Sequence, residues 1–155
     1  MAFLLNWGQY LTLFVVAMLP IVELRGAIPI GAGFDLPFWT NYAIAVAGNI
    51  LPVPFLILFA TKILRWLTKF RKIGPFFQKI LDKGEEKAAK IGNVELLGLF
   101  CFVAVPLPGT GAWTGSLIAA TLSLKFWPSV ATIAAGVAAS GIIMGILSYG
   151  LFSLF

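Results

Sequence analysis

The pattern that most constrains this chain is a phrase that occurs twice. Residues 38–48 and residues 126–136 both read Phe-Trp-x3-Ala-x3-Ala-Gly, at an offset of 88 positions in a chain of 155 residues. Each copy opens a long apolar run, and an apolar stretch broken by Gly and Pro precedes each copy. Many membrane transporters are built from two such halves, each combining a broken helix with an intact one. We therefore expect an internal repeat, with residues 1–61 as the first half and residues 94–155 as the second.

The composition places the chain in a membrane. Hydrophobic residues make up 60% of it and charged residues only 11%, whereas about a quarter of a soluble domain is charged. No polar stretch is long enough to bury a core of its own, so residues 1–155 are expected to form a single membrane domain. No Lys or Arg precedes Arg25, so the positive start of a cleavable signal peptide is missing.

Residues that the chain lacks disfavour several classes of function. It contains one cysteine, Cys101, and no histidine, which argues against a disulfide framework and against the usual zinc and haem sites. The nucleotide-binding pattern G-x4-G-K-[ST] does not occur, and a Ser/His/Asp or Cys/His constellation needs a histidine. We therefore expect neither an enzyme nor a protein that carries a cofactor.

Nine of the eleven basic residues fall between Lys62 and Lys90. A short basic connection between apolar segments marks the cytoplasmic side of a membrane protein. We interpret this charge as orientation and attraction to anionic lipid headgroups, and we expect no nucleic-acid partner. Segment 62–93 is thus predicted to be cytoplasmic, with the chain in the plasma (inner) membrane. Its apolar residues recur at helical spacing, which predicts an amphipathic helix at the membrane surface. These residues are Phe70, Ile73, Phe76, Phe77, Ile80 and Leu81.

Four apolar stretches can be drawn, and two of them can cross a membrane as continuous helices. A span needs about 20 apolar residues, which residues 38–60 and 127–154 provide. Asp35 is expected to cap the first of these helices. A proline near a helix start costs nothing, whereas one further along bends the helix. The prolines at the starts are Pro37 and Pro128, and those inside the first helix are Pro52 and Pro54.

The other two stretches, residues 3–22 and 96–124, are interpreted as re-entrant hairpins. Residues 106–111 read Pro-Leu-Pro-Gly-Thr-Gly, which a straight helix does not tolerate. The legs on either side are each about half a membrane thick, and the turn between them must be buried in protein or line a cavity. In the first stretch the turn is expected at Glu23–Pro29 and the return leg at residues 30–33.

A bundle of four full spans is the alternative, and Lys125 distinguishes the two topologies. With hairpins, Lys125 lies on the cytoplasmic side and the two halves are inverted copies. With four spans, Lys125 lies outside, and Glu23 and Arg25 fall in an external loop. The positive-inside rule favours the hairpins. The expected fold is all-α, an inverted repeat in which each half is a re-entrant hairpin plus one transmembrane helix, with the amphipathic helix between the halves.

Glu23 and Arg25 are the only charged side chains before Asp35, and the hairpin topology puts them near the bilayer centre. A charge there costs roughly 2.5–3.5 kcal/mol, which favours a functional role over a structural ion pair. Arg25 presents a planar cation suited to phosphate or carboxylate. Glu23, removed from water, is a candidate carrier of a coupling proton. Gly26 permits a non-helical turn that would let the pair meet.

The second turn offers backbone groups in place of charge. Gly109 and Gly111 allow close approach, and free N–H groups at the start of the return helix form an anion site. Facing turns would place Arg25 opposite these amides. Trp113 is expected either to cover an apolar ligand or to serve as an ordinary packing or interface aromatic. The further candidate ligand-binding residues are Pro108, Thr110 and Thr114.

Small residues four positions apart predict close helix contacts, within the chain or between copies of it. Asn49 is expected either to hydrogen-bond across the bundle or to face the cavity. The small-residue pairs are Gly111/Gly115, Gly141/Gly145, Ala43/Ala47 and Ala131/Ala135.

Three segments carry a family resemblance: residues 23–29 (Glu-Leu-Arg-Gly-Ala-Ile-Pro), the basic middle segment, and residues 106–113 (Pro-Leu-Pro-Gly-Thr-Gly-Ala-Trp). On these motifs the chain resembles the putative small multidrug export proteins of bacteria and archaea, which look like compact relatives of the DedA superfamily. The resemblance implies two facing re-entrant hairpins, a homo-oligomer and a transport role. For DedA proteins it implies a polyprenyl-phosphate or other phospholipid substrate, with acidic residues and arginines in the hairpins. Glu23 and Arg25 match the first hairpin, and the second hairpin lacks the arginines.

We therefore predict a secondary transporter that uses no ATP of its own and moves an anionic amphipathic substrate through a site between the hairpins. Arg25 and the second-turn amides bind the substrate, and Glu23 carries the proton. The expected partners are membrane lipids, a small amphipathic or lipid-phosphate substrate, and further copies of the chain. Two alternatives stay open: a proton-coupled exporter of lipophilic drugs in which Arg25 is structural, and a non-transporting membrane protein that organises lipids.

Overall fold

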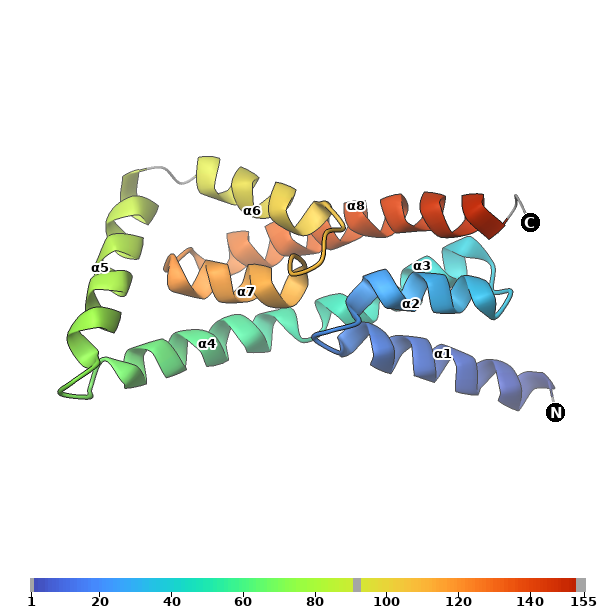
Figure 1. The fold of residues 1–155 in the computed structure, drawn as a ribbon, viewed down its shortest axis with the longest axis horizontal. Helices are drawn as coiled ribbons and strands as arrows, with labels where there is room; N and C mark the ends of the chain where they lie inside the picture. Colours follow the sequence, from blue (N-terminus) through green and yellow to red (C-terminus); the bar gives the residue numbers. More distant parts are fainter. Residues whose placement is uncertain (1, 91–92, 153–155) are drawn as a thin grey trace.

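The computed structural model describes residues 2–90 and 93–152, and it contains only helices and connections in this part of the chain. Figure 1 shows an elongated bundle in which α1 begins and α8 ends at the same end of the long axis. The helices are α1 (Ala2–Met18), α2 (Glu23–Gly33), α3 (Phe38–Ile50), α4 (Val53–Leu67), α5 (Gly74–Lys90), α6 (Val94–Ala104), α7 (Ala112–Thr121) and α8 (Phe126–Phe152).

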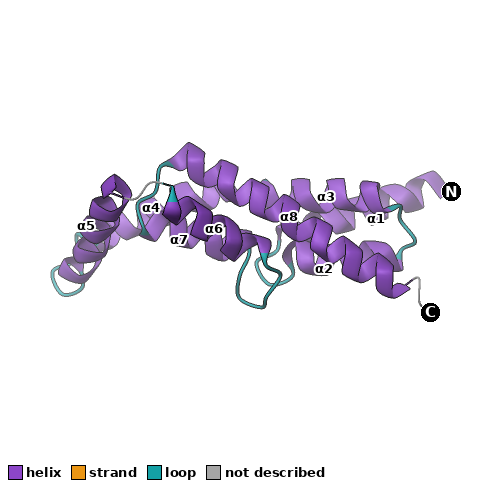
Figure 2. Ribbon diagram, turned by 90° about the horizontal axis from the view of Figure 1, so that it is seen from above, coloured by secondary structure: helices purple, strands orange, loops and turns teal. Residues whose placement is uncertain are grey.

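Two pairs of short helices fold back in the middle of the bundle. α1 runs inward from one end and α2 returns to that end, whereas α6 runs inward from the opposite end and α7 returns to it (Figures 1 and 2). The turns of the two pairs, residues 19–22 and 105–111, therefore meet near the centre of the long axis. α3 with α4 on one side, and α8 on the other, run alongside the pairs.

Two segments are long and apolar enough to cross a membrane, namely Phe38–Leu67 with 30 residues and Phe126–Gly150 with 25. A span requires about 20 residues. The surface of the bundle is also apolar, since Phe55 and Trp127 are 70% and 76% exposed. Soluble proteins rarely expose large contiguous apolar patches. The chain is a membrane protein.

The break predicted in the third apolar stretch is confirmed, and the second stretch, predicted as a continuous helix bent at Pro52 and Pro54, is interrupted at Leu51 and Pro52. α3 ends at Ile50 and α4 begins at Val53, with Pro52 as the residue before α4. Proline has no N–H to donate, so it interrupts the helix there. α6 ends at Ala104 and α7 begins at Ala112, so residues 105–111 are not helical, as the Pro/Gly pattern predicts.

The first turn lies earlier in the chain than we predicted. We expected a turn at Glu23–Pro29 and a return leg at residues 30–33, but the turn is Leu19–Val22, and all of Glu23–Gly33 is helix α2. Gly26 is helical, and its N–H donates to the Val22 carbonyl at 3.0 Å. Glycine and proline are tolerated inside membrane helices when neighbouring groups satisfy the freed backbone groups. The prediction that Gly26 forms the turn is therefore wrong.

Asp35 does not cap α3, contrary to our prediction. Pro37 precedes α3, and no side chain caps this helix start. Asp35 instead has a φ of 57° and ends α2. The Leu36 N–H then donates to the Gly31 carbonyl at 3.1 Å, which is the Schellman pattern at a helix C-terminus. Asp and Asn adopt this left-handed conformation more readily than most residues.

A matching turn ends α7. Ser123, 88 positions after Asp35, has a φ of 51°. The Leu124 N–H donates to the Ala119 carbonyl at 3.0 Å, in the same pattern. The same offset relates the first residues of α3 and α8. The phrase that recurs in the sequence thus coincides with a recurring helix–turn–helix geometry.

The glycine that closes the repeated phrase brings α3 and α8 close to their neighbours. A Cβ on Gly48 would lie 2.6 Å from the Phe14 carbonyl oxygen of α1, and a Cβ on Gly136 would lie 2.8 Å from Val103 Cβ of α6. Neither distance is tolerated by a real side chain. Each glycine therefore sets the spacing between a long helix and the first helix of a folded-back pair.

The small-residue pairs behave differently from one another. Gly141 and Gly145 confirm their predicted close contact, because a Cβ on either would collide with an aromatic ring of α3. The alanine pairs face outward, so a contact within the chain is wrong for them, and a contact between copies stays a prediction. These exposed residues are Ala43, Ala47, Ala131 and Ala135.

The predicted amphipathic helix is α5, which lies across one end of the bundle (Figure 1). It packs on α4 and α7, with Leu81 only 7% exposed, whereas Phe76 is 65% exposed. The helix begins at Gly74, so Phe70 and Ile73 lie in the connection before it. The amphipathic pattern is therefore confirmed for the part of the segment that is helical.

Candidate functional site

Two charged side chains of α2 join the central turns. Glu23 is the first residue of α2 and Arg25 lies two positions later. Glu23 is only 4% exposed, and Arg25 is half-buried. Side chains two positions apart on a helix point in different directions. The two therefore reach different parts of the second turn instead of pairing with each other.

Glu23 caps helix α7 from the other half of the chain. Its Oε1 accepts a hydrogen bond from the Trp113 backbone N–H at 3.1 Å, across a sequence separation of 90 residues. Trp113 is the second residue of α7, and Gly111, the residue before the helix, has no side chain to offer as a cap. The first N–H groups of a helix are unpaired and carry the positive end of its dipole, so a carboxylate is favourable there.

The backbone around this contact is unusual at both partners. Gly111 has a φ of 121°, and a Cβ there would lie 2.0 Å from Glu23 Oε2. Glu23 itself has a φ of 50°, which is uncommon for a residue other than glycine. Such strain persists only where the surroundings fix it, and it clusters at functional sites. The close approach of carboxylate and backbone thus requires glycine at position 111.

Arg25 binds carbonyl groups of the second turn, two of which also accept hydrogen bonds within the turn. Its Nη1 donates to the Leu107 carbonyl and, at 2.8 Å, to the Thr110 carbonyl. Its Nη2 donates to the Thr110 hydroxyl and lies 3.5 Å from the Val105 carbonyl oxygen. Val105 directly follows α6, whose C-terminal carbonyls are unpaired and carry the negative end of the helix dipole. A cation is therefore favourable at this place.

Trp113 adds a third link between the turns. Its indole N–H donates to the Met18 carbonyl at 3.0 Å, and Met18 is the last residue of α1. Of the two roles expected for Trp113, a packing role with a hydrogen bond is the one that these contacts show. The ends of α1, α6 and α7 thus each receive a partner from the opposite turn.

A cavity of about 700 Å³ opens beside these contacts. Sites for small molecules typically measure about 300–1,000 Å³. Seven of the nine predicted ligand-binding residues line it, and the two others, Gly111 and Trp113, do not. The lining residues are Pro20, Ile21, Val22, Glu23, Arg25, Gly26, Pro108, Gly109, Thr110 and Thr114.

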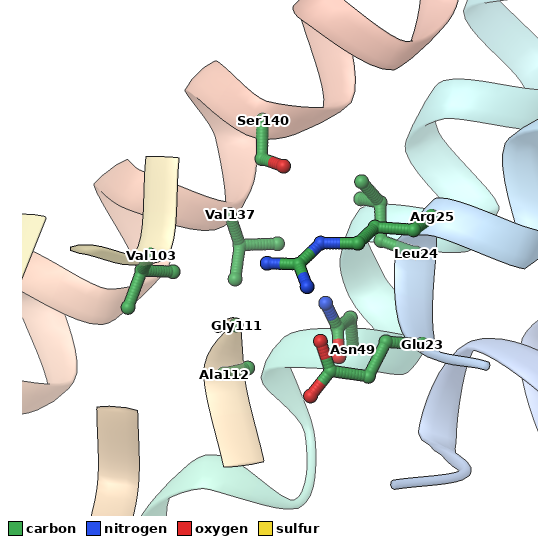
Figure 3. A pocket seen from close by; sticks show the side chains of 9 residues that line it. All are labelled: Glu23, Leu24, Arg25, Asn49, Val103, Gly111, Ala112, Val137 and Ser140. Atoms are coloured by element: carbon green, nitrogen blue, oxygen red, sulfur yellow. The ribbon is translucent and has the colours of Figure 1, made fainter. Parts of the chain in front are cut away.

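A narrower cleft borders the same two charged side chains (Figure 3). Its empty space of about 170 Å³ is too narrow to hold a water molecule. Asn49 of α3 and Ser140 of α8 line it together with Glu23 and Arg25. Asn49 is 3% exposed, and its Oδ1 has no hydrogen-bond partner among the described residues. Of the two alternatives for Asn49, facing the interior space is therefore the one observed.

Sequence reasoning missed the groups that hold Arg25, and it assigned the second-turn amides to a ligand. The acceptors for Arg25 include the carbonyls of Val105 and Leu107, which leave no signal in a sequence because every residue has a carbonyl. The Trp113 amide is bound by Glu23 in this structure. The one available signal was Gly111, since an unpaired helix start next to a glycine needs a cap from elsewhere.

Comparison with protein families matches residues 23–143 to the family described as putative small multi-drug export protein. The matched range contains α2, both long segments in large part, the basic segment and the second turn. Among curated proteins and among solved structures, nothing matches. Because the match spans more than half of the chain and includes Glu23, Arg25 and Thr110, the chain belongs to the family of putative small multi-drug export proteins.

Proposed function

We propose that the chain is a secondary membrane transporter whose substrate site is the junction of the two central turns. The family description points to export. The observation that carries the proposal is the cavity of about 700 Å³ that borders Glu23 and Arg25 in the middle of an apolar bundle. Ionisable side chains at membrane depth are costly, and they are retained mainly on substrate and ion pathways.

The proposed topology makes both folded-back pairs re-entrant and the two halves inverted copies of each other. The connection between α7 and α8, which contains Lys125, lies at the same end of the bundle as α5, in line with the positive-inside rule (Figure 1). Trp39 and Trp127, at equivalent positions of the repeat, are 72% and 76% exposed. They lie at the starts of α3 and α8, at opposite ends of the bundle, as interface aromatics do. Segment 62–90 then faces the cytoplasm.

The lining of the cavity favours an anionic amphipathic substrate. Arg25 supplies a permanent cation, and Thr110 and Thr114 supply hydroxyl groups. Pro20 and Ile21 supply apolar surface, and Ile21 is 94% exposed. A lipid phosphate such as a polyprenyl phosphate combines an anionic head with an apolar chain. A cationic substrate would be repelled by the positive charge of Arg25.

Glu23 couples proton movement to substrate binding because it occupies the anion site itself. As a carboxylate, it accepts from the Trp113 N–H and carries a negative charge beside Arg25. When it is protonated, that charge is lost and the charge-assisted hydrogen bond weakens. The α7 amide then becomes available to the anion of the substrate, and the neighbouring charge of Arg25 is no longer balanced by a carboxylate. Asn49 Oδ1, which lines the same cleft and lacks a donor, is the acceptor available to the protonated carboxyl group.

Flux in proteoliposomes tests this function with matched variants. The probe is a fluorescently labelled polyprenyl phosphate, and its movement is followed with and without a pH gradient. Glu23→Gln is expected to abolish the response to the gradient, and Arg25→Ala is expected to lower flux at least about tenfold, because a charge-assisted contact of about 1.5–3 kcal/mol is lost. Arg25→Lys retains the positive charge, and it replaces Arg25→Ala in the comparison if the alanine variant unfolds the turn.

Two control variants each remove one charge, one negative and one positive, at positions away from the junction. Asp35→Asn removes a carboxylate between α2 and α3, and Lys125→Ala removes a cation between α7 and α8. Both are expected to leave flux unchanged. Flux that survives Arg25→Ala in a folded protein would eliminate the proposed anion site.

A proton-coupled exporter of lipophilic drugs is the second candidate, and the family description favours it. In that mechanism Glu23 exchanges a proton for a cationic drug, and Arg25 serves only to hold the second turn. The drug resistance of cells that express Glu23→Gln distinguishes the two candidates. The exporter is supported if this variant loses the resistance that the wild type confers and if the wild type moves no polyprenyl phosphate. A non-transporting, lipid-organising role is supported if neither ligand class moves under any gradient.

A further inference from the structure

We propose that the groove along α4 and α7 binds one anionic phospholipid of the surrounding bilayer. The groove has a volume of about 1050 Å³, and its lining is almost entirely apolar. Most of its lining residues belong to α4, which extends from the centre of the bundle toward the end that carries α5 (Figure 1). The large apolar side chains in its wall include Leu51, Phe55, Leu58, Phe59, Trp113 and Phe126.

Two cations define one end of the groove. Lys62 and Arg65 line it together with the apolar side chains, and among the side chains that the structure describes no acidic one does. Positions three, four and seven apart share one face of a helix, so Phe55, Leu58 and Lys62 form a single stripe on α4. Phe55 and Leu58 are 70% and 55% exposed. The stripe is therefore apolar for most of its length and positive at its end, which complements a lipid with an anionic headgroup.

The length of the stripe fits one leaflet. Lys62 lies ten residues after Pro52, at the bend between α3 and α4, which corresponds to about 15 Å along a helix. The hydrocarbon core of a bilayer is about 30 Å thick, so one leaflet contributes about 15 Å. A phosphate held by Lys62 and Arg65 thus leaves an acyl chain that reaches the centre, where Met18 and Trp113 close the groove.

A second copy of the chain is a less suitable occupant because of its charge. Residues 62–95 contain nine basic and four acidic residues, so a second copy in the same orientation would bring net positive charge toward Lys62 and Arg65. An anionic lipid brings the opposite charge. The site lies outside the cavity at the central turns, so the proposal holds whether or not the junction transports a substrate.

Native mass spectrometry of the full chain in detergent tests the proposal. The probes are phosphatidylglycerol and phosphatidylcholine with identical acyl chains, added in a titration. Wild type is expected to retain one phosphatidylglycerol with an affinity about 30-fold above that of phosphatidylcholine, since each cation contributes about 1 kcal/mol at a charged lipid surface. The double variant Lys62→Gln/Arg65→Gln is expected to lose this preference. Leu58→Trp, which fills the groove, is expected to lose the lipid while both cations are retained.

The control removes the same charge elsewhere in the basic segment. Lys69→Gln/Arg71→Gln changes two residues that do not line the groove, and it is expected to retain the bound lipid. Equal loss in this control, or no preference in the wild type, would overturn the site. A further test introduces Phe59→Cys in a Cys101→Ser background and looks for a disulfide between two copies in membranes. Such a disulfide would also overturn the site, because it would show that a second copy covers the groove. Thermal unfolding of each variant establishes that it is folded.

Discussion

At the scale of single residues, Glu23 and Arg25 bring opposite charges to opposite helix ends. The carboxylate meets the N-terminus of α7 through Trp113, and the guanidinium meets the turn that follows α6. Each charge is thus stabilised by backbone groups at the helix ends beside the break at residues 105–111. In an apolar bundle this arrangement offsets the cost of burying both charges, because an unsatisfied backbone group there is costly as well.

Gly111→Ala is expected to weaken the junction more than Gly109→Ala does. Both glycines have positive φ, so both substitutions add backbone strain of about 1–3 kcal/mol. Only at position 111 would the new Cβ collide with the Glu23 carboxylate, since nothing lies within 4 Å of a Cβ on Gly109. The difference between the two melting temperatures in detergent therefore isolates the Glu23 contact. Equal melting temperatures would show that the contact contributes nothing.

Asn49→Leu is expected to raise stability and to abolish the pH response of transport. The buried Asn49 Oδ1 lacks a donor, and burying an unpaired polar atom costs about 1–3 kcal/mol. Asn41→Leu is the comparison, because Asn41 Oδ1 is also unpaired among the described residues, whereas Asn41 Nδ2 donates to the Ile28 carbonyl at 2.7 Å and to the Tyr149 hydroxyl at 3.0 Å. That variant should be less stable than wild type. Thermal unfolding and flux against pH are the measurements, and a destabilised Asn49→Leu would argue against the proposed role of Asn49.

At the scale of helices, the spacing of the bundle is set by glycines instead of large interlocking side chains. Gly48 lets α3 approach α1, and Gly136 lets α8 approach α6. Lipid is as apolar as a leucine side chain, so helices in a membrane associate through close van der Waals contact rather than through the hydrophobic effect. The glycine that ends the repeated phrase is therefore needed for close helix packing, and both halves use it at the same position.

Gly136→Ala is expected to destabilise the protein by about 1–3 kcal/mol, because the extra methyl group overpacks the contact with Val103. Gly98→Ala on α6 is the control, since a Cβ there meets nothing within 4 Å. This control should be neutral or more stable by up to about 1 kcal/mol, as is usual when alanine replaces a helical glycine. Chemical or thermal unfolding in detergent compares the two. A stabilising effect of Gly136→Ala would mean that α6 and α8 are not in close contact.

At the scale of the whole molecule, the bundle has two distinct ends. α1 begins and α8 ends at one of them, together with the connection between α2 and α3. The other end carries α5 and the connection between α7 and α8 (Figure 1). A bundle of four full spans would put Lys125 at the end opposite the basic segment. The relative position of these two charged regions is therefore what decides the membrane topology.

Thiol labelling from each side of the membrane tests the orientation. Single cysteines are introduced at Lys72, Lys125 and Asp35 in a Cys101→Ser background, and a reagent that does not cross membranes is added to intact cells or to inside-out vesicles. Cysteines at Lys72 and Lys125 should react from the cytoplasmic face, and a cysteine at Asp35 should react from the other face. Opposite labelling of Lys72 and Lys125 would exclude the re-entrant topology.

Residue patterns alone were enough to predict the membrane class, the family, the break at residues 105–111 and the two residues at the centre of the junction. These follow from composition, from proline and glycine positions and from two charges in an apolar run, which are local properties of the chain. The same patterns misplaced the first turn because Gly26 and Pro29 look like helix breakers in isolation, and they misassigned Asp35 because a left-handed helix end leaves only a weak local signal.

The contacts of Glu23 and Arg25 became known from the packed fold and not from the sequence. Their partners are backbone amides and carbonyls about 80 to 90 residues away, and backbone groups are the same in every residue, so no pattern in the sequence can name them. The same holds for the unpaired oxygen of Asn49 and for the lipid-sized groove along α4. Each arises from surfaces that become neighbours only when the two halves pack against each other.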